Sequence, residues 1–221
     1  MTHEEILQGL FDNTLVGNAP EVKDLVNQGL ADQLSAESML YDGLIPSLEE
    51  VGARFERGDF FVPEMLIAAR AMQGALDILR PLLAETGVEQ VGTYVMGTVK
   101  GDVHDIGKNL VNIMLEGAGF TVHDLGVNVA PEVFVEKIVE HKPDVVGFSA
   151  FLTTTMPMFK ANINALEKAG LRDEVIVMVG GAPVTQEYAD AVGADGYAAD
   201  ASTAVRLAKD LIQRKRSRVT A

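Results

Sequence analysis

Residues 91–117 read VGTYVMGTVKGDVHDIGKNLVNIMLEG, and this stretch decides the fold. The apolar run 91–99 predicts a buried β-strand, and residues 108–117 predict a helix. The connection between them contains an aspartate and a histidine two residues apart and ends in a glycine. Loops that follow the carboxyl ends of parallel strands are where α/β proteins bind ligands. The histidine in this loop is therefore a candidate binding residue.

Asp102 and His104 form the candidate pair in this connection. One imidazole nitrogen of His104 can bind a metal while Asp102 holds the other nitrogen and fixes the tautomer. The pattern Asp-x-His-x-x-Gly is a weak signal alone, because an aspartate before a helix is also a common N-cap. A solvated loop in which Asp102 caps the helix remains the alternative at this point.

Two later segments have the same strand-then-loop pattern. Residues 145–155, VVGFSAFLTTT, predict a buried strand that runs into a hydroxyl-rich loop. Residues 175–183, VIVMVGGAP, predict a strand that ends in paired glycines, which allow close approach to the backbone. Three unusual loops therefore follow three strands, and we expect them at the same edge of one sheet.

The periodicity divides the chain into a helical part, residues 1–88, and an α/β part, residues 89–221. Apolar residues in the first part recur at helical spacing in four segments, which predicts a four-helix bundle. The second part alternates short apolar runs with helices, which predicts a parallel sheet with helices on both faces. The expected strands are 91–99, 120–125, 144–150, 175–179 and 196–199, the expected helices are 108–117, 132–141, 156–169, 186–192 and 201–214, and the expected linker is 86–90.

With these segments assigned, the chain resembles a known family. Asp102-x-His104-x-x-Gly107, Ser149 further along and the pair Gly180-Gly181 are similar to the cobalamin-binding signature of methionine synthase. In size, the chain resembles the corrinoid proteins of methyltransferase systems. The resemblance implies a flavodoxin- or Rossmann-like, doubly wound, five-stranded parallel sheet with strand order 2-1-3-4-5, preceded by a four-helix bundle that acts as a cap.

The resemblance also implies the site. His104 is expected to be the lower axial cobalt ligand, with Asp102 as its hydrogen-bond partner and the Thr155 hydroxyl completing a proton relay. Other residues expected to contact the cofactor or line the slot for its nucleotide tail are Val103, Asp105, Ile106, Gly107, Ser149, Phe151, Thr153, Gly180, Gly181, Ala182 and Tyr197. The cap is expected to cover the corrin with Phe55, Val62 and Met65, although the same spacing is typical of ordinary core residues, and Thr155 is also placed to cap a helix.

One position departs from the family pattern. The family's second motif is Ser-x-Leu, whereas this chain has Ser149-Ala150-Phe151. We expect the bulkier aromatic ring to reshape part of the nucleotide slot and leave the serine in place.

The function that the resemblance implies is that of a methyl carrier. The cofactor would be cobalamin, cycling between cob(I)alamin and methylcobalamin, that is, between cobalt(I) and methylcobalt(III). The chain would not be catalytic alone. Its expected partners are a donor-specific methyltransferase, an acceptor methyltransferase that uses tetrahydrofolate or a thiol, and a reductive activation protein. The sequence does not identify the methyl donor or the acceptor.

Composition and charge exclude several classes of protein and of site. The formal net charge of −14 argues against nucleic-acid binding, and the absence of cysteine excludes disulfides and thiolate metal sites. No apolar run reaches the roughly 18 residues that cross a membrane, and no secretory signal is recognisable, so we expect a cytoplasmic protein. The alternatives are an adenosylcobalamin-dependent light sensor, the small subunit of a carbon-skeleton mutase, and a cofactor-free signalling domain of the same fold.

Overall fold

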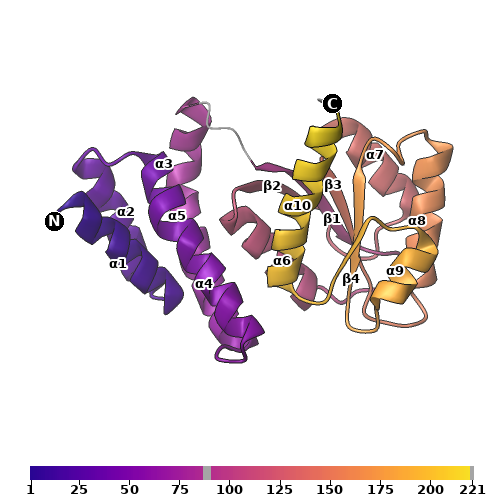
Figure 1. Cartoon of the computed structure of the whole chain (residues 1–221), viewed down its shortest axis with the longest axis horizontal. Helices are drawn as coiled ribbons and strands as arrows, with labels where there is room; N and C mark the ends of the chain where they lie inside the picture. Colours follow the sequence, from indigo (N-terminus) through magenta and orange to yellow (C-terminus); the bar gives the residue numbers. More distant parts are fainter. Residues whose placement is uncertain (87–90, 220–221) are drawn as a thin grey trace. The chain divides into compact units, whose positions relative to one another are not determined.

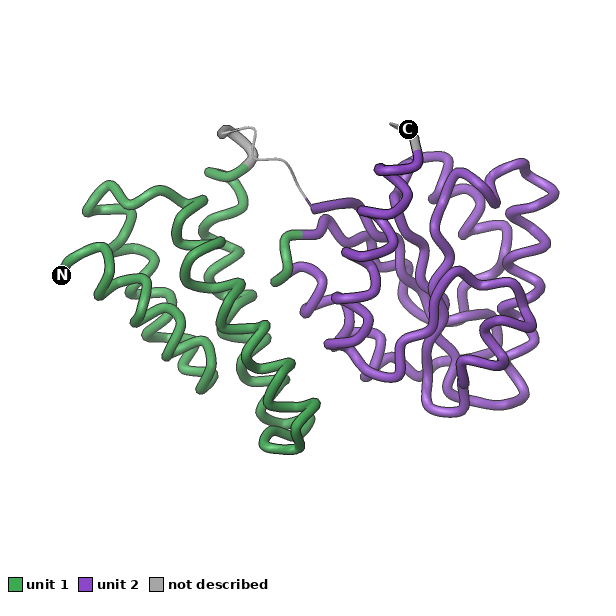
Figure 2. The backbone as a smooth tube through the Cα atoms, viewed as in Figure 1, with its two compact units in different colours: residues 1–89, 117–119 green, residues 90–116, 120–221 purple. Residues whose placement is uncertain are grey.

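The computed structural model describes residues 1–86 and 91–219. The chain divides into two compact units, residues 1–89 with 117–119 and residues 90–116 with 120–221 (Figure 2). The expected boundary between residues 88 and 89, and all of the expected linker except Thr86, lie outside the described residues.

The first unit is helical. Its elements are α1 (His3–Leu15), α2 (Ala19–Ala31), α3 (Ala36–Ser38), the π-helical segment η1 (Met39–Leu44), α4 (Ile45–Glu56) and α5 (Val62–Thr86) (Figure 1). The Thr2 hydroxyl accepts the amide hydrogen of Glu5 while the Glu5 carboxylate accepts that of Thr2, which makes a capping box for α1. The four expected helical segments are therefore confirmed. The third is one continuous helical run from residue 36 to residue 56, and its π-helical segment was not predicted because hydrophobic spacing does not report local under-winding.

The second unit is a five-stranded parallel sheet of order β2-β1-β3-β4-β5, as the family resemblance implied. The strands are β1 (Gly92–Thr98), β2 (Phe120–Asp124), β3 (Val145–Ser149), β4 (Ile176–Gly180) and β5 (Gly196–Ala198). The helices are α6 (Ile106–Gly117), α7 (Pro131–His141), α8 (Pro157–Lys168), α9 (Gln186–Val192) and α10 (Ala201–Val219). The doubly wound α/β prediction is confirmed.

Two helix ends differ from the sequence-based expectation by two residues or more. Helix α6 begins at Ile106 rather than at residue 108, and the Asp105 carbonyl oxygen accepts the Asn109 amide hydrogen at 2.7 Å. Helix α10 continues past Arg214 to Val219. Most of its last residues are polar or basic, so the hydrophobic pattern does not mark them as helical, although arginine and lysine are good helix formers.

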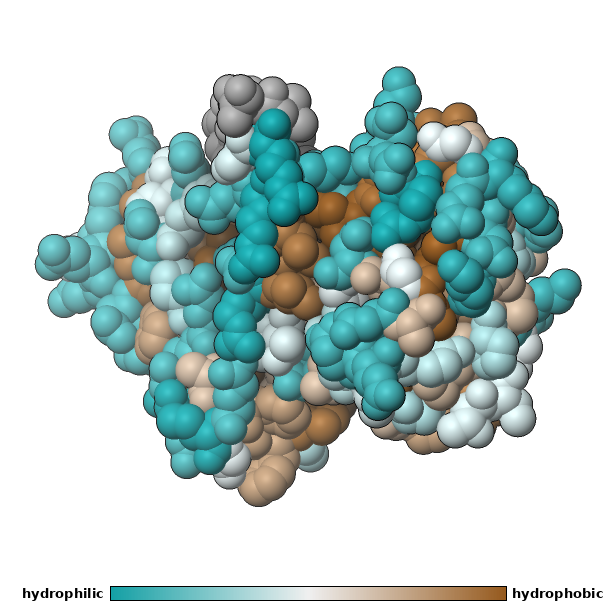
Figure 3. Space-filling view, turned by 45° about the vertical axis from the view of Figure 1, so that its right-hand side comes forward, coloured by the Kyte–Doolittle hydropathy of each residue, from teal (hydrophilic) through white to brown (hydrophobic). Residues whose placement is uncertain are grey.

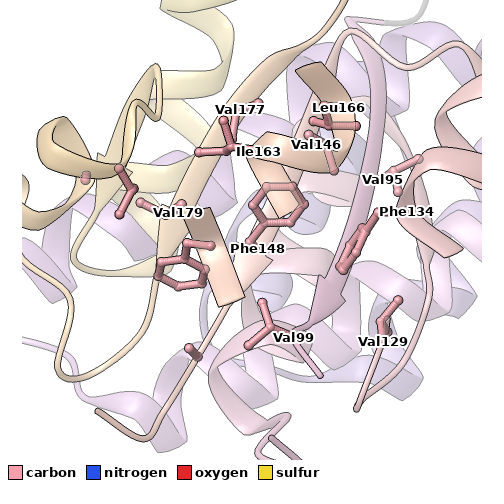
Figure 4. Close-up of a cluster of buried hydrophobic side chains, with 14 of the residues drawn as sticks. Val95, Val99, Val129, Phe134, Val146, Phe148, Ile163, Leu166, Val177 and Val179 are labelled. Carbon is pink, nitrogen blue, oxygen red and sulfur yellow. The ribbon is translucent and has the colours of Figure 1, made fainter. Parts of the chain in front are cut away.

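The sheet has helices on both faces, with α6 and α10 on one side and α7, α8 and α9 on the other (Figure 1). In Figure 4, Phe134 of α7 and Ile163 and Leu166 of α8 lie in one layer with strand residues such as Val146 and Phe148. All five of these residues are at most 1% exposed, so the sheet rests on a well-packed core that fixes the ends of its strands.

Hydrophilic residues cover much of the face shown in Figure 3, as the charge of −14 leads one to expect. Among the described residues, none of the helices combines the length and the apolar character needed to cross a membrane.

Candidate functional site

Asp102 is the centre of a hydrogen-bond cluster at the carboxyl end of β1. Its side chain is fully buried. Oδ1 accepts hydrogen bonds from the His104 amide at 3.1 Å and from His104 Nδ1 at 2.7 Å. Oδ2 accepts hydrogen bonds from the amides of Phe151 and Leu152, at 2.8 and 3.2 Å, and from the Thr155 hydroxyl at 2.7 Å. Asp102 thus joins the β1–α6 loop to the β3–α8 loop, which are about fifty positions apart in the chain.

This cluster keeps Asp102 ionised. Burial alone would raise the pKa of the carboxyl group. The hydrogen bonds that it accepts from Thr155, His104 and the Phe151 amide stabilise the charged form and outweigh burial, so the pKa lies well below its ordinary range. An ionised carboxylate can only accept hydrogen bonds, so Nδ1 of a neutral His104 carries the proton and its Nε2 has a free lone pair.

His104 remains accessible although its neighbour is buried. Its side chain is 45% exposed, and within the described parts of the chain no hydrogen bond involves Nε2. The Phe151 ring stacks on the imidazole, with ring centroids 4.4 Å apart and an interplanar angle of 27°. The loop therefore presents one oriented imidazole with one nitrogen available, which is the arrangement of a metal-ligating histidine.

The ends of β3 and β4 form the second part of the site. Ser149, the last residue of β3, is paired with Gly180, the last residue of β4. Gly181 follows with φ +134°, and a Cβ there would lie 1.9 Å from the Ala150 carbonyl oxygen. Only glycine fits this backbone, because the β4–α9 connection passes directly over the end of β3. The paired glycines thus leave a side-chain-free stretch of backbone beside Ser149.

The remaining predicted site residues of the α/β unit are distributed around this edge. Val103, Ile106, Gly107, Thr153 and Ala182 are exposed, and Asp105 is half-buried. Tyr197, in β5, packs against the apolar core, which the loose local pattern did not predict. The expectation that these residues contact a cofactor remains a prediction.

Three predicted residues belong to the helical unit. Phe55 lies in α4 and is half-buried, Val62 is the first residue of α5 and is 41% exposed, and Met65 is fully buried. Their role as a cover for the corrin also remains a prediction.

Asn128 supports the His104 loop from a second side, which the sequence analysis missed. Asn128 has φ +56°, its amide donates to the Asp102 carbonyl oxygen at 2.9 Å, and its Oδ1 accepts the Gly101 amide hydrogen at 2.8 Å. The buried Thr98 hydroxyl donates to the His104 carbonyl oxygen at 3.0 Å. Asparagine is one of the few residues that adopt a left-handed conformation readily, so Gly126-Val127-Asn128 was the available signal for a specialised turn.

Lys108 is a second unpredicted support. Its side chain is 1% exposed, and Nζ donates to both carboxylate oxygens of Asp124, at 2.7 and 2.6 Å, and to Asn109 Oδ1 at 2.7 Å. The ion pair ties the first turn of α6 to the last residue of β2. A buried lysine needs such partners, because an unpaired buried cation is costly.

Comparison with known proteins identifies the family. Residues 92–206 and residues 6–80 each match a family model described as a B12 binding domain. The dimethylamine corrinoid protein of Methanosarcina barkeri is 44% identical over 213 residues, which cover 96% of this chain and all of the relative. The chain is a corrinoid protein of the B12-binding family. The predicted relationship to the corrinoid proteins of methyltransferase systems is thereby confirmed, and its cofactor is a corrinoid.

Solved structures agree with this corrinoid protein in fold. The methanol:cobalamin methyltransferase complex MtaBC of Methanosarcina barkeri contains a chain that matches 96% of this one, with a TM-score of 0.83 and 26% identity over 81% of that chain. A cobalamin-binding protein from Desulfitobacterium hafniense matches 93% of this chain and 98% of its own, with a TM-score of 0.77 and 29% identity. The cofactor-free signalling alternative is therefore wrong, and neither the light-sensor nor the mutase alternative is favoured.

Proposed function

We propose that this corrinoid protein is the methyl-carrying subunit of a methylamine methyltransferase system in the cytoplasm. The observation that carries the proposal is the accessible His104 imidazole, whose Nδ1 is held at 2.7 Å by the buried Asp102. When bound, the corrinoid supplies a cobalt atom that accepts a methyl group from one partner and gives it to the next. The chain itself binds and orients the cofactor and presents it to its partners.

The site residues suit this cofactor. His104 Nε2 would be the protein ligand to cobalt, and the Asp102 carboxylate would hold the imidazole in the Nδ1–H tautomer. The side-chain-free backbone at Gly180 and Gly181, beside Ser149, would accept the nucleotide tail of the corrinoid. The exposed apolar side chains of Val103 and Ile106, on either side of His104 in the sequence, suit contact with the largely apolar macrocycle.

Asp102 and Thr155 would also manage a proton. Whenever His104 is released from the metal, its Nε2 can take a proton, and the ionised Asp102 would stabilise the resulting imidazolium. The Thr155 hydroxyl lies 2.7 Å from Asp102 Oδ2 and 2.9 Å from the Leu152 carbonyl oxygen, and its one hydrogen can be donated to either acceptor. It can therefore keep the carboxylate fixed in either state.

The methyl donor is assigned by similarity. Relatives named dimethylamine corrinoid proteins are 42–44% identical over 95–96% of this chain, and one is 49% identical over 75% of it, whereas a monomethylamine corrinoid protein is 33% identical over 95%. The methanol-system neighbour is 26% identical. We therefore assign dimethylamine as the donor, delivered by a dimethylamine-specific methyltransferase, and leave the acceptor as tetrahydrofolate or a thiol on a second methyltransferase. A reductive activation protein completes the proposed set of partners.

The test is a donor panel. The corrinoid-loaded, reduced protein is combined in turn with methyltransferases specific for dimethylamine, monomethylamine and methanol, each with its radiolabelled donor. We expect release of monomethylamine from dimethylamine and little or no demethylation of the other donors. Equal activity with methanol would contradict the donor assignment, and no activity with any donor would contradict the carrier role.

A further inference from the structure

Phe151 contacts both Asp102 and His104, each through different atoms. Its amide donates to Asp102 Oδ2 at 2.8 Å, and its ring stacks on the His104 imidazole at a centroid separation of 4.4 Å. The side chain is nevertheless about half exposed, at 51%. Phe151 is therefore not a core residue that happens to lie near His104. It lies at the surface, against the imidazole, at the position where the family motif has leucine.

A hydrogen bond alone does not orient an imidazole. The single contact between His104 Nδ1 and Asp102 Oδ1 leaves the ring free to rock about the line that joins these two atoms. A planar group against one face of the imidazole blocks that motion. Stacked aromatic pairs of this kind contribute roughly two- to tenfold to an equilibrium constant beyond simple burial. A leucine side chain has no flat face with which to do the same.

We propose that Phe151 is a positioning residue that holds the plane of the His104 imidazole for axial ligation of cobalt. The inference rests on the proposed function, because it takes His104 as the ligand. The phenylalanine that stands in place of the family's leucine then acts on His104, the proposed cobalt ligand, rather than on the slot for the nucleotide tail. Phe151 then affects how well the imidazole binds the metal, and the uptake of the corrinoid depends on other residues.

The first experiment needs no cofactor. Isotope-labelled histidine is introduced into the wild-type protein and into Phe151→Ala, Phe151→Leu and Phe151→Tyr, and His104→Ala identifies the His104 signals by their loss. In the wild type and in Phe151→Tyr, ring currents should shift the carbon-bound protons of His104. The shift should disappear in Phe151→Ala and Phe151→Leu. Identical His104 signals in the wild type and Phe151→Ala would overturn the orienting role.

The second experiment uses the corrinoid-loaded proteins in the cobalt(II) state, at one pH well above the pKa of imidazole. Visible and paramagnetic resonance spectra give the ratio of nitrogen-ligated to unligated cobalt. We expect this ratio to fall roughly two- to tenfold in Phe151→Ala, less in Phe151→Leu, and not at all in Phe151→Tyr. Val139→Ala, on the exposed face of α7 with 58% of the residue accessible, is the control for loss of an exposed apolar side chain.

The two experiments separate the possible failures. An unchanged ratio in Phe151→Ala, with nitrogen ligation present in the wild type, would overturn the role of Phe151 and leave the proposed function intact. Absence of nitrogen ligation in the wild type would overturn His104 as ligand, and with it the ligation role of Phe151. A ratio that falls in Phe151→Ala but stays at the wild-type value in Phe151→Leu would mean that bulk, rather than a flat ring, matters, and would also overturn the inference. A ratio that falls equally in Phe151→Ala and Phe151→Tyr would overturn it too, because the tyrosine keeps the flat ring.

Discussion

The Thr155 hydroxyl donates a hydrogen bond of 2.7 Å to Asp102 Oδ2, although the two residues are 53 positions apart and lie on loops after different strands. Both side chains are buried. The bond therefore links two neighbouring loops of the sheet through a charged acceptor that is shielded from water. Hydrogen bonds to a charged partner in such surroundings are stronger than those between neutral groups.

Thr155→Val should weaken this link without changing the shape of the side chain much. The valine removes one of the donors that lower the pKa of Asp102, so the pKa should move back toward its ordinary range. Loss of a hydrogen bond to a buried charge should destabilise the α/β unit by about 1.5–3 kcal/mol. Urea unfolding followed by tyrosine fluorescence measures this, since three of the four tyrosines lie in that unit. Thr155→Ser keeps the hydroxyl and should stay close to wild type, and equal losses in the two variants would contradict the argument.

His104→Ala should leave corrinoid uptake intact and remove the nitrogen ligand. The other predicted contacts, at Ser149 and the paired glycines, do not depend on the imidazole. Paramagnetic resonance of the cobalt(II) protein should therefore lose its nitrogen superhyperfine splitting. His3→Ala, at the exposed N-terminal end of α1, is the matched control and should keep the splitting. Splitting that survives in His104→Ala would exclude this residue as the ligand.

The sequence predicted the strand order of the sheet through the family resemblance, and predicted Asp102, His104 and Thr155 as partners. The strand ends were predictable because apolar runs in a parallel sheet are buried on both faces and stop where the loops reach solvent. The contacts that support the His104 loop and the start of α6 from β2 and the residues after it were not predictable. The contacts of Asn128 and of the Lys108–Asp124 pair form only when β2 lies beside β1, and no local pattern reports a contact between residues 27 or 16 positions apart in the chain.

Two glycines of the motif differ in a way that the sequence alone could not show. Gly107 and Gly181 look alike in the motif, as small residues beside a cofactor. A Cβ at Gly107 would meet nothing within 4 Å, whereas a Cβ at Gly181 would collide with the chain's own Ala150 carbonyl oxygen. Substitution at Gly181 therefore tests folding together with binding, and Gly107 is the position at which cofactor binding can be tested alone.

Gly107→Leu should fold and fail to bind cobalamin well. Gly107 lies in the first turn of α6, so a leucine there should leave the unfolding free energy unchanged or raise it by up to ~1 kcal/mol. Its side chain would project from the exposed start of α6, where the cofactor is expected. Thermal unfolding of the apoprotein and visible titration with cobalamin measure the two effects. Gly107→Ala should be intermediate in binding, and wild-type affinity in a folded Gly107→Leu would place the cofactor elsewhere.

The stacked pair His123 and His141 should make stability depend on pH. Their rings lie 3.7 Å apart and nearly parallel, with Glu140 3.6 Å from His141 Nε2. Burial lowers the pKa of His123, and the neighbouring His141 charge lowers it further, although Glu140 opposes this. The unfolded chain, in which the pKa is roughly 6.5, then binds more protons than the native protein just below that pH. Stability that is present above about pH 6.5 is therefore lost as the pH falls through the lowered native pKa.

His123→Gln removes this titration and should flatten the fall in unfolding free energy between about pH 7 and pH 5. Urea unfolding at a series of pH values, compared with wild type and with His3→Gln, isolates the contribution of the pair. His3→Gln should follow the wild-type curve, because His3 lies in the helical unit and contacts neither His123 nor His141. If His123→Gln follows the wild-type curve as well, the stacked pair does not couple folding to pH, and the acid sensitivity of the protein arises from other groups.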